Sequence, residues 1–368
     1  MPQKEFISRL DGFAEDGCKV DMGRWSAYLN LDVLLEMIFS EAPGFIKAGA
    51  DVKGILAATD MFLKMAQVLG IYPIFYHLLQ LPFMKQFGPK PTDKEGAGVL
   101  FGMAERGVKD RAQSVGGVGT DGADGKTQQK DMLQSLTEYR DAAGQPTLLA
   151  DVKNEALVAV FTGVDTTPAV FRAALLHIST NTVVHRKLVA EIDAAERAGN
   201  LSRPAQFSEV RQLVYLGAIL DEALRLHPPM STPFWRTAPQ EGRVVEGHLI
   251  PSGTHIGINE WAISRNASVY GQDTDVFRPE RFLDAETGTH RRMGKKDLLF
   301  GYGDCLCAGR HFASMLMRKT LVEVFRDYEV VVAHPDRAWR SVGAVSIKHH
   351  DFFCVLHKRV REKRAPIA

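Results

Sequence analysis

The feature that most constrains this chain is a glycine-rich run at residues 300–310, with the sequence FGYGDCLCAGR. Two glycines and a tight loop precede Cys307, and a helical pattern follows it directly. A helix N-terminus carries positive partial charge and free amide groups, and both favour a thiolate over a thiol. The run therefore predicts a thiolate at Cys307 that can bind a metal or react.

The pair formed by Cys305 and Cys307 leaves two other interpretations open, a metal clip or a redox pair. Either would normally need further cysteine or histidine ligands nearby, and His290 and His311 are the candidates in the neighbouring sequence. The chain has four cysteines in 368 residues, too few and too scattered for a disulfide framework. We therefore expect reduced thiols in a protein that faces the cytosol.

Charge balance argues against a nucleic-acid partner. The chain has 45 lysines and arginines against 44 aspartates and glutamates, a formal net charge of +1. A nucleic-acid binder would carry a large basic excess. With 45% apolar and 24% charged residues, the composition is that of a soluble globular protein.

The most apolar stretch runs from Ala66 to Met84. It contains Pro73, Pro82 and His77, whereas a membrane span needs about 20 predominantly apolar residues. We therefore expect no transmembrane segment in this chain. We expect the stretch to form a buried or lid-forming segment, with contact to a membrane surface as an amphipathic patch as the alternative.

The periodicity of the chain predicts a mostly helical protein with small sheets to one side. A helix is expected after a cap at Asp21 and another over residues 52–69. Residues 114–130 are glycine-rich and polar, which is typical of a flexible linker. Their formal match to a dinucleotide fingerprint, Gly117-x-Gly119-x-x-Gly122, is treated as chance because no strand precedes it. Further helices are expected at 184–198, 208–227 and 308–327, and strands at 243–249, 255–259, 328–332 and 352–355.

The longest helical pattern covers about residues 148–181, and its centre contains weak helix formers from Thr162 to Pro168. Glycine and β-branched residues weaken a helix, and Pro168 removes the amide that would bond the carbonyl of Val164. Two interpretations stay open: a functional kink within one long helix, or a helix–turn–helix break at Pro168.

Two further motifs are less specific by themselves. Glu222 and Arg225 are i, i+3 neighbours on one helix face, and an ordinary surface pair would have the same spacing. Residues 277–282, FRPERF, form a charged turn between two aromatic residues.

Taken together in this order and spacing, these motifs resemble the cytochrome P450 family. The resemblance covers nearly the whole chain from about Asp11 onward, and it is closest to fungal members of the microsomal class, above all over residues 259–281. It implies a single partial domain over residues 1–368, mainly α with small β-sheets. It also implies a haem-thiolate monooxygenase that inserts one oxygen atom from dioxygen into an apolar organic substrate, in fungal secondary metabolism or detoxification.

The resemblance also implies partners and a location. The cofactor would be haem b, and electrons would come from an NADPH-dependent reductase of the diflavin type. The full-length form would lie on the cytosolic face of the endoplasmic reticulum membrane. Residues 66–84 align with the family's lid between two distal helices. The basic run from Arg291 to Lys296 would lie near the face where the reductase docks, with a solvated loop as the alternative.

On the proximal side, the resemblance makes Cys307 the axial ligand of the haem iron, whose electron donation favours O–O cleavage. Gly303 and Gly309 would let the backbone lie close to the haem, and Phe300 would pack against the ligand loop. On the distal side, Gly163 would leave room for dioxygen. Thr166, with Asp165 behind it, would steer protons to the bound oxygen.

Glu222, Arg225 and Arg281 resemble the family's buried charge triad, which braces the ligand loop. Removing one member of a buried charge network costs roughly 3–5 kcal/mol, so Arg281→Ala is expected to abolish haem incorporation. Arg236 is expected to bind a haem propionate.

The sequence departs from the family pattern in two places. Cys305 stands where the family usually carries an arginine or histidine that holds a propionate. The family's membrane anchor, most of its main sheet and its first distal loop have no counterpart, so we expect a fold that lacks its N-terminal portion. The alternative to an enzyme is therefore a non-catalytic truncated remnant unable to retain haem, and a Cys-x-Cys metal or redox protein is a third interpretation. The substrate, the effect of Cys305 and the oligomeric state are not predicted.

Overall fold

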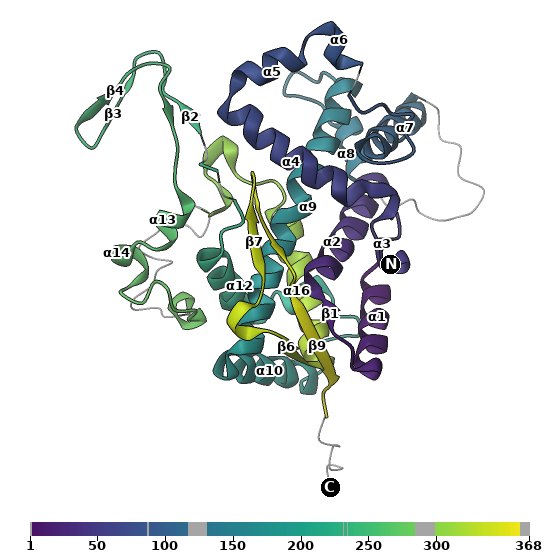
Figure 1. The fold of residues 1–368 in the computed structure, drawn as a ribbon, viewed down its shortest axis with the longest axis vertical. Coiled ribbons are helices and arrows are strands. Elements are labelled where there is room, and N and C mark those ends of the chain that lie inside the picture. The colour runs from purple at the N-terminus through teal and green to yellow at the C-terminus, as the bar shows by residue number, and fades with distance from the viewer. Residues whose placement is uncertain are drawn as a thin grey trace. The chain divides into compact units, whose positions relative to one another are not determined.

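A computed structural model describes residues 2–86, 88–116, 131–230, 232–233, 235–283 and 299–360 of the chain. These residues divide into two compact units. Unit 1 comprises Met1–Asp16 and Val20–Pro168, and unit 2 comprises Gly17–Lys19 and Ala169–Ala368. Both units are rich in helices (Figure 1). The basic run at 291–296, His290 and most of the expected linker lie outside the described residues, while residues 114–116 belong to a helix.

Unit 1 is built from helices and ends within a long one. Its elements are α1 (Pro2–Asp16), β1 (Val20–Asp21), α2 (Met22–Phe39), α3 (Phe45–Ala48), η1 (Val52–Gly54), α4 (Ile55–Ile71), α5 (Pro73–Leu79), α6 (Pro82–Lys85), α7 (Ala97–Gly116), α8 (Met132–Glu138) and the first half of α9 (Leu149–Thr180).

Helix α2 is the core helix of unit 1, because it buries residues on nearly every side. It begins as expected: the side chain of Asp21 accepts a hydrogen bond from the backbone amide of Arg24 at 3.3 Å. Its buried Asp32 accepts from the amides of Gly44, Phe45 and Ile46 at 2.8–3.0 Å. A helical carboxylate therefore caps the start of α3.

Helix α4 carries apolar surface that unit 1 does not cover. Its buried residues Ile55, Thr59 and Leu63 are spaced four apart and so share one face. Among the described residues, Val52–Ile71 alone is long and apolar enough to cross a membrane, with 17% of its most apolar window buried. The expectation of no such segment rests on residues 66–84, which this helix overlaps only in part. Because this finding rests on length and composition alone, that expectation stays a prediction.

Unit 2 contains the remaining helices and the antiparallel strand pairs described below. Its helices are the second half of α9, α10 (Thr182–Arg197), α11 (Phe207–Val210), α12 (Val214–Leu226), α13 (Glu260–Ser264), α14 (Ala267–Tyr270), η2 (Pro279–Phe282), η4 (Gly303–Cys305), α16 (Arg310–Asp327) and η5 (Pro335–Arg337). Its strands are β2 (Arg236–Thr237), β3 (Arg243–Val245), β4 (His248–Ile250), β5 (His255–Ile256), β6 (Tyr328–Val332), β7 (Arg340–Gly343), β8 (Ile347–His350) and β9 (Phe353–Lys358).

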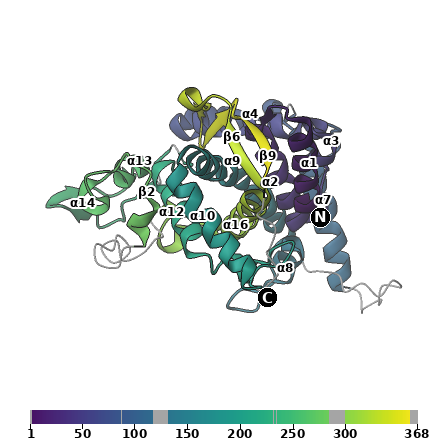
Figure 2. The ribbon, with the colours of Figure 1, turned by 90° about the horizontal axis from the view of Figure 1, so that it is seen from below.

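The longest strand pair joins β6 to β9, which lie side by side in Figures 1 and 2. The register runs from Tyr328 opposite Lys358 to Val332 opposite Cys354. The strand predicted at 328–332 is confirmed, because alternate residues Tyr328, Val330 and Val332 are buried.

Two predicted elements in unit 2 are wrong in their extent. The strand predicted at 243–249 is a hairpin, in which β3 pairs with β4 around Glu246 and Gly247. Both turn residues have positive φ, 49° and 78°, as a tight two-residue hairpin turn requires. The helix predicted at 208–227 is interrupted, because α11 ends at Val210 and α12 begins at Val214.

Candidate functional site

The loop that carries Cys307 is closed by backbone hydrogen bonds within unit 2. The amide of Cys307 donates to the carbonyl of Phe300 at 2.7 Å, and the amide of Leu306 donates to the carbonyl of Gly303 at 3.1 Å. Cys307 is exposed and lies three residues before α16 begins. The loop thus holds one sulfur at the N-terminal end of a long helix with an open side, which is what an axial iron ligand requires.

Glycines give this loop its shape. Gly303 has a positive φ of 64°, and a Cβ at Gly309 would lie 3.8 Å from the sulfur of Cys307, an ordinary contact. Gly301, which sequence reasoning passed over, is the most restricted: its φ is 81°, and a Cβ there would overlap the carbonyl of Cys305. The Phe-Gly-x-Gly spacing of residues 300–303 could have indicated the importance of this glycine. Cys305 itself is exposed.

The metal-clip interpretation of Cys305 and Cys307 gains no support from the described part of the chain. There, no group of three or more histidine, cysteine, aspartate or glutamate side chains is placed to hold a metal ion. A structural metal site normally takes four protein ligands, whereas haem iron needs a single axial one. The geometry therefore fits a haem ligand better than a clip.

The three charged residues of the predicted triad meet in unit 2, and all are buried. Glu222 receives two hydrogen bonds from Arg225, at 2.7 and 2.9 Å, and a third from Nε of Arg281 at 2.9 Å. The surface-pair interpretation of Glu222 and Arg225 is therefore wrong. A buried charge tolerates this environment only when paired and hydrogen-bonded, as it is here.

The two arginines also fasten a segment that precedes Arg281. Arg225 donates to the carbonyls of Ser264 and Thr274 at 2.9 and 2.7 Å. Both arginines donate to the carbonyl of Val276. The triad thus stabilises the backbone of residues 270–281 as well as its own charges.

Asp273 is a fourth member of the network that sequence reasoning missed. Its carboxylate accepts from Arg278 at 2.7 Å and from Arg281 at 3.1 Å. The Arg278 guanidinium first, and Arg281 after it, hold the pKa of this carboxyl well below its usual range. The added carboxylate balances the second arginine of the triad.

Arg236 is exposed in β2 and donates from Nη1 to the carbonyl of Trp235 at 3.0 Å. Its propionate role stays a prediction. His311, the other candidate ligand near the loop, is exposed in the first turn of α16.

The distal candidates lie in the part of α9 that belongs to unit 1. The helix runs unbroken from Leu149 to Thr180 with Pro168 inside it, so the helix–turn–helix alternative is wrong. Pro168 leaves the carbonyl of Val164 without its helical donor, and the side-chain amide of Asn30 supplies one at 3.2 Å. The same amide donates to the carbonyl of Gly163 at 3.0 Å. Asn30 is thus the long-range partner that supports this part of the helix.

Two threonines, one turn apart, form side-chain hydrogen bonds to carbonyls of the same helix. Thr162 donates to the carbonyl of Val158 at 2.7 Å, and Thr166 donates to the carbonyl of Thr162 at 3.0 Å. Such back-bonding slightly destabilises and often bends a helix. Asp165 is buried beside them. A Cβ on Gly163 would lie 3.0 Å from Leu34, so this glycine also permits close packing against α2.

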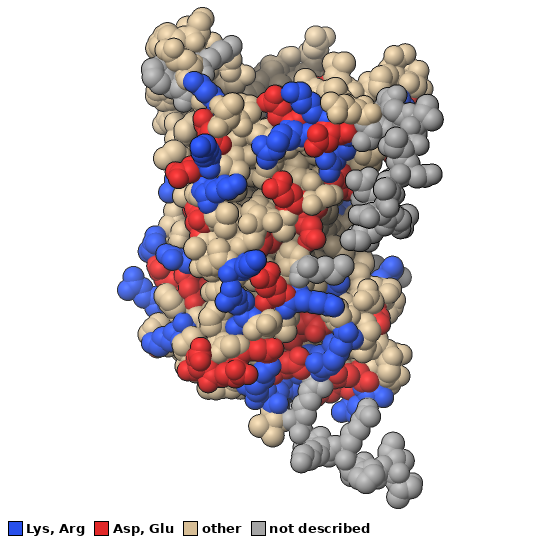
Figure 3. Space-filling model, turned by 90° about the vertical axis from the view of Figure 1, so that its right-hand side faces the viewer, with Lys and Arg blue, Asp and Glu red and all other residues tan. Residues whose placement is uncertain are grey.

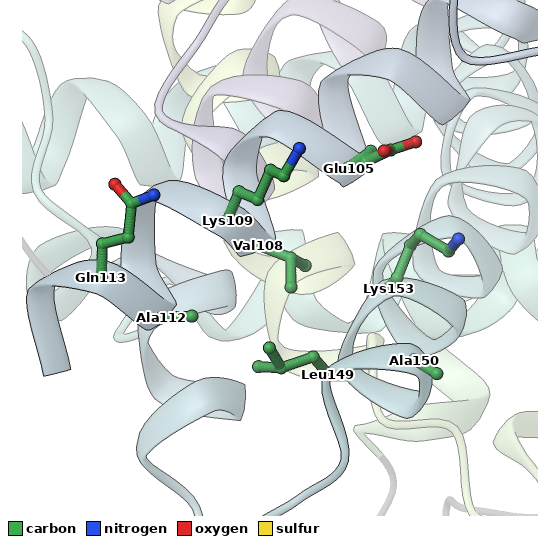
Figure 4. Close-up of a pocket in the computed structure, with 8 residues that line it drawn as sticks. All are labelled: Glu105, Val108, Lys109, Ala112, Gln113, Leu149, Ala150 and Lys153. Carbon is green, nitrogen blue, oxygen red and sulfur yellow. The ribbon is translucent and has the colours of Figure 1, made fainter. Parts of the chain in front are cut away.

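A pocket of about 500 Å³ lies in unit 1 between α7 and the first turns of α9 (Figure 4). Its floor is apolar, with Val108, Ala112 and Leu149, and Lys109 and Lys153 stand at its rim. None of the predicted site residues lines it.

Over the face drawn in Figure 3, basic and acidic side chains are interspersed, in keeping with the near balance of charge.

Comparison with known proteins finds similarity in both sequence and fold. The family model for Cytochrome P450 matches residues 3–350. The "Cytochrome P450 monooxygenase ACRTS1" of Alternaria alternata is 30% identical over 358 residues, 97% of this chain and 93% of that protein. The "Cytochrome P450 monooxygenase ABA1" of Pyricularia oryzae is 33% identical over 346 residues, 93% of this chain and 64% of that protein.

A solved structure shares the fold. The crystal structure of a cytochrome P450 (CYP102L1) superposes with a TM-score of 0.76 at 21% identity, covering 97% of this chain and 73% of that one. The chain spans 64% of the length of ABA1 from Pyricularia oryzae and 59% of aba1 from Botryotinia fuckeliana. The helix-rich fold with small sheets expected from the sequence is thereby confirmed.

Proposed function

The chain belongs to the cytochrome P450 family of oxygen-incorporating oxidoreductases, and we propose that it is a haem-thiolate monooxygenase acting on an apolar organic substrate. The observation that carries the proposal is the exposed sulfur of Cys307, held by its loop directly before α16. The cofactor proposed is haem b, with fungal secondary metabolism or detoxification as the setting, since the relatives are fungal monooxygenases.

Cys307 would hold the iron, and Arg236 would pair with a propionate. When bound, the haem supplies the chemistry that activates dioxygen. The triad would keep the ligand loop in place. Arg225 of α12 binds the carbonyls of Thr274 and Val276, and Arg281 binds Glu222 of α12.

The ferrous carbon monoxide complex of the purified, haem-supplemented protein tests the proposal. Thiolate ligation is expected to give a strongly red-shifted Soret band. A protein that binds no haem would support the alternative, a non-catalytic remnant. Bound zinc without haem would support the Cys-x-Cys metal site.

Thr166 and Asp165 are proposed to deliver protons in the reaction. The Thr166 hydroxyl donates to the carbonyl of Thr162, a bond that it can exchange for one to a water or a bound ligand. Asp165 is buried one residue before it and would pass protons on to Thr166.

Thr166→Val is therefore expected to lower product formation per NADPH consumed by about 10²-fold, the lower end for a lost acid–base group. Haem content and the carbon monoxide spectrum should stay unchanged, because valine keeps the shape of the side chain. Thr180→Val, which removes the same kind of back-bonded hydroxyl at the end of α9, is the matched control. Equal product yields from all three proteins would contradict the role.

The electron donor proposed is an NADPH-dependent diflavin reductase, and the location proposed is the cytosolic face of the endoplasmic reticulum membrane. Helices α4 to α6 support the second proposal with an exposed apolar surface, which is unusual for a surface that stays in water. Co-sedimentation with phospholipid vesicles tests this contact. The exposed residues are Met61, Met65, Val68, Ile71, Tyr72, Ile74, Phe75, Tyr76, Leu78, Leu81 and Phe83.

A further inference from the structure

Three histidines from separate elements of unit 2 form a cluster that none of the roles above uses. His177 lies in α9, His227 caps the C-terminus of α12 and His349 lies in β8. The Nε2 atoms of His177 and His227 are 2.8 Å apart. Trp339 stacks on His349 with ring centroids 4.0 Å apart and meets His227 edge-on at 5.5 Å.

This histidine cluster adjoins the two segments that carry the triad, α12 and residues 270–281. His227 follows directly on α12, which carries Glu222 and Arg225. The ring of His177 stacks on Phe277 at 4.2 Å and 8°. Phe277 belongs to residues 270–281, whose carbonyls bind Arg225 and Arg281. The cluster therefore joins α9 to the end of α12 and to the segment that precedes Arg281.

We propose that His177 and His227 are positioning residues, whose hydrogen bond clamps the end of α12 and the Phe277 segment to α9, and that the clamped fold loses stability as the pH falls. One part of this inference rests on the proposed function: the clamp would support the triad, which in turn is expected to brace the Cys307 loop. The clamp itself needs no haem.

The hydrogen bond limits how many protons the pair can hold. Two Nε2 atoms at bonding distance require one N–H donor and one bare acceptor nitrogen. A second proton on the pair would leave two donors facing each other, so the bond would be lost. His349 adds a third ring that cannot gain a proton without placing charge in a buried site.

The surroundings oppose protonation of all three rings. Burial first, then His227 and Arg225, lower the pKa of His177 to about 3. Burial first, then Arg265 and Arg225, lower the pKa of His227 to about 4. For His349, burial and then the basic groups Arg172, His227 and His350 lower the pKa to about 3.

The sign of the pH effect follows from these shifts. The unfolded chain binds a proton at each histidine near pH 6.5, whereas the folded chain resists doing so until about pH 3–4. The stability contributed by the neutral cluster is therefore complete above pH 6.5 and is lost as the pH falls below it. The expected increase in the unfolding equilibrium constant is about tenfold per pH unit for each histidine.

Urea unfolding of the full chain between pH 7.5 and pH 5 tests the clamp. The wild type is expected to show this steep dependence, and His177→Gln to show a slope smaller by about one proton, because glutamine has no proton to gain. His255→Gln, a change at an exposed histidine of β5, should keep the wild-type slope. A slope unchanged by His177→Gln would overturn the proposal.

Ring NMR of the wild-type histidines decides the case if His177→Gln does not fold. Three rings that stay neutral at pH 5.5 would support the clamp, and twelve histidines that all titrate near pH 6.5 would overturn it. In the haem-loaded wild type and in haem-loaded His255→Gln, acid should abolish the thiolate spectrum over the same pH range in which the protein unfolds. Absence of haem at every pH would count against the proposed function alone, since the unfolding slope would still report on the clamp.

Discussion

Replacement of Cys307 by serine is expected to abolish the strongly red-shifted Soret band of the ferrous carbon monoxide complex and all monooxygenase activity. Serine has nearly the same size, but its hydroxyl is not ionised at neutral pH and cannot supply the electron-rich sulfur on which O–O cleavage depends. The side chain is exposed, and the bond to Phe300 comes from the backbone amide, so the loop should keep its shape. Absorption spectroscopy at matched haem load measures the effect.

Cys305→Ser is the matched control for this variant. It makes the same atomic change two residues away, at a second exposed thiol in the same loop. The red-shifted band should survive in Cys305→Ser. The opposite pattern, with the band lost only in Cys305→Ser, would assign the iron to Cys305 and refute the role of Cys307. Loss in both variants would point to a site that needs both sulfurs.

Much of the fold follows from local signals in the sequence. The cap at Asp21 and the strand at 328–332 depend on residues close together in the chain. A period of two or of 3.6 residues needs no knowledge of distant partners. The same holds for the loop before α16, where glycines shape the backbone locally.

The parts that sequence reasoning missed depend on distant partners. Asn30 reaches the carbonyl of Val164, 134 residues away, and nothing around Asn30 indicates that role. The histidine cluster likewise draws on three elements, with His177 and His227 separated by 50 residues. Each of these polar groups reads as an ordinary helical or capping residue until the fold is known.

The triad was only partly predictable from local sequence. Its Glu-x-x-Arg spacing is local and is equally typical of a surface pair, so only the family resemblance distinguished burial from exposure. Burial changes its energetics, because a removed partner leaves charge in a site without water. Asp273 could have been suspected, since two arginines and one glutamate leave an uncompensated positive charge in a buried site.

Arg281→Ala is expected to reduce the free energy of unfolding by about 3–5 kcal/mol. The guanidinium donates to Glu222, to both carboxylate and carbonyl oxygens of Asp273, and to the carbonyl of Val276. Alanine would leave the buried carboxylate of Glu222 without that donor. Since ordinary proteins have about 5–15 kcal/mol of stability in total, the loss takes a large share of it. Haem incorporation should fail, because residues 270–281 would lose the bond that Arg281 makes to Glu222 of α12.

Arg340→Ala is the control variant, because it removes an arginine from an ion pair that is exposed instead of buried. Arg340 pairs with Asp351 at 3.2 Å, but both side chains are more than half exposed, 56% and 59%. Such a surface pair contributes about 0–1 kcal/mol, so this variant should bind haem and unfold at nearly the wild-type urea concentration. Arg281→Lys should fall between the two, since lysine keeps the charge but cannot reproduce the planar fork of donors. Stable, haem-loaded Arg281→Ala protein would show that the network does not brace the ligand loop, whatever the role of Cys307.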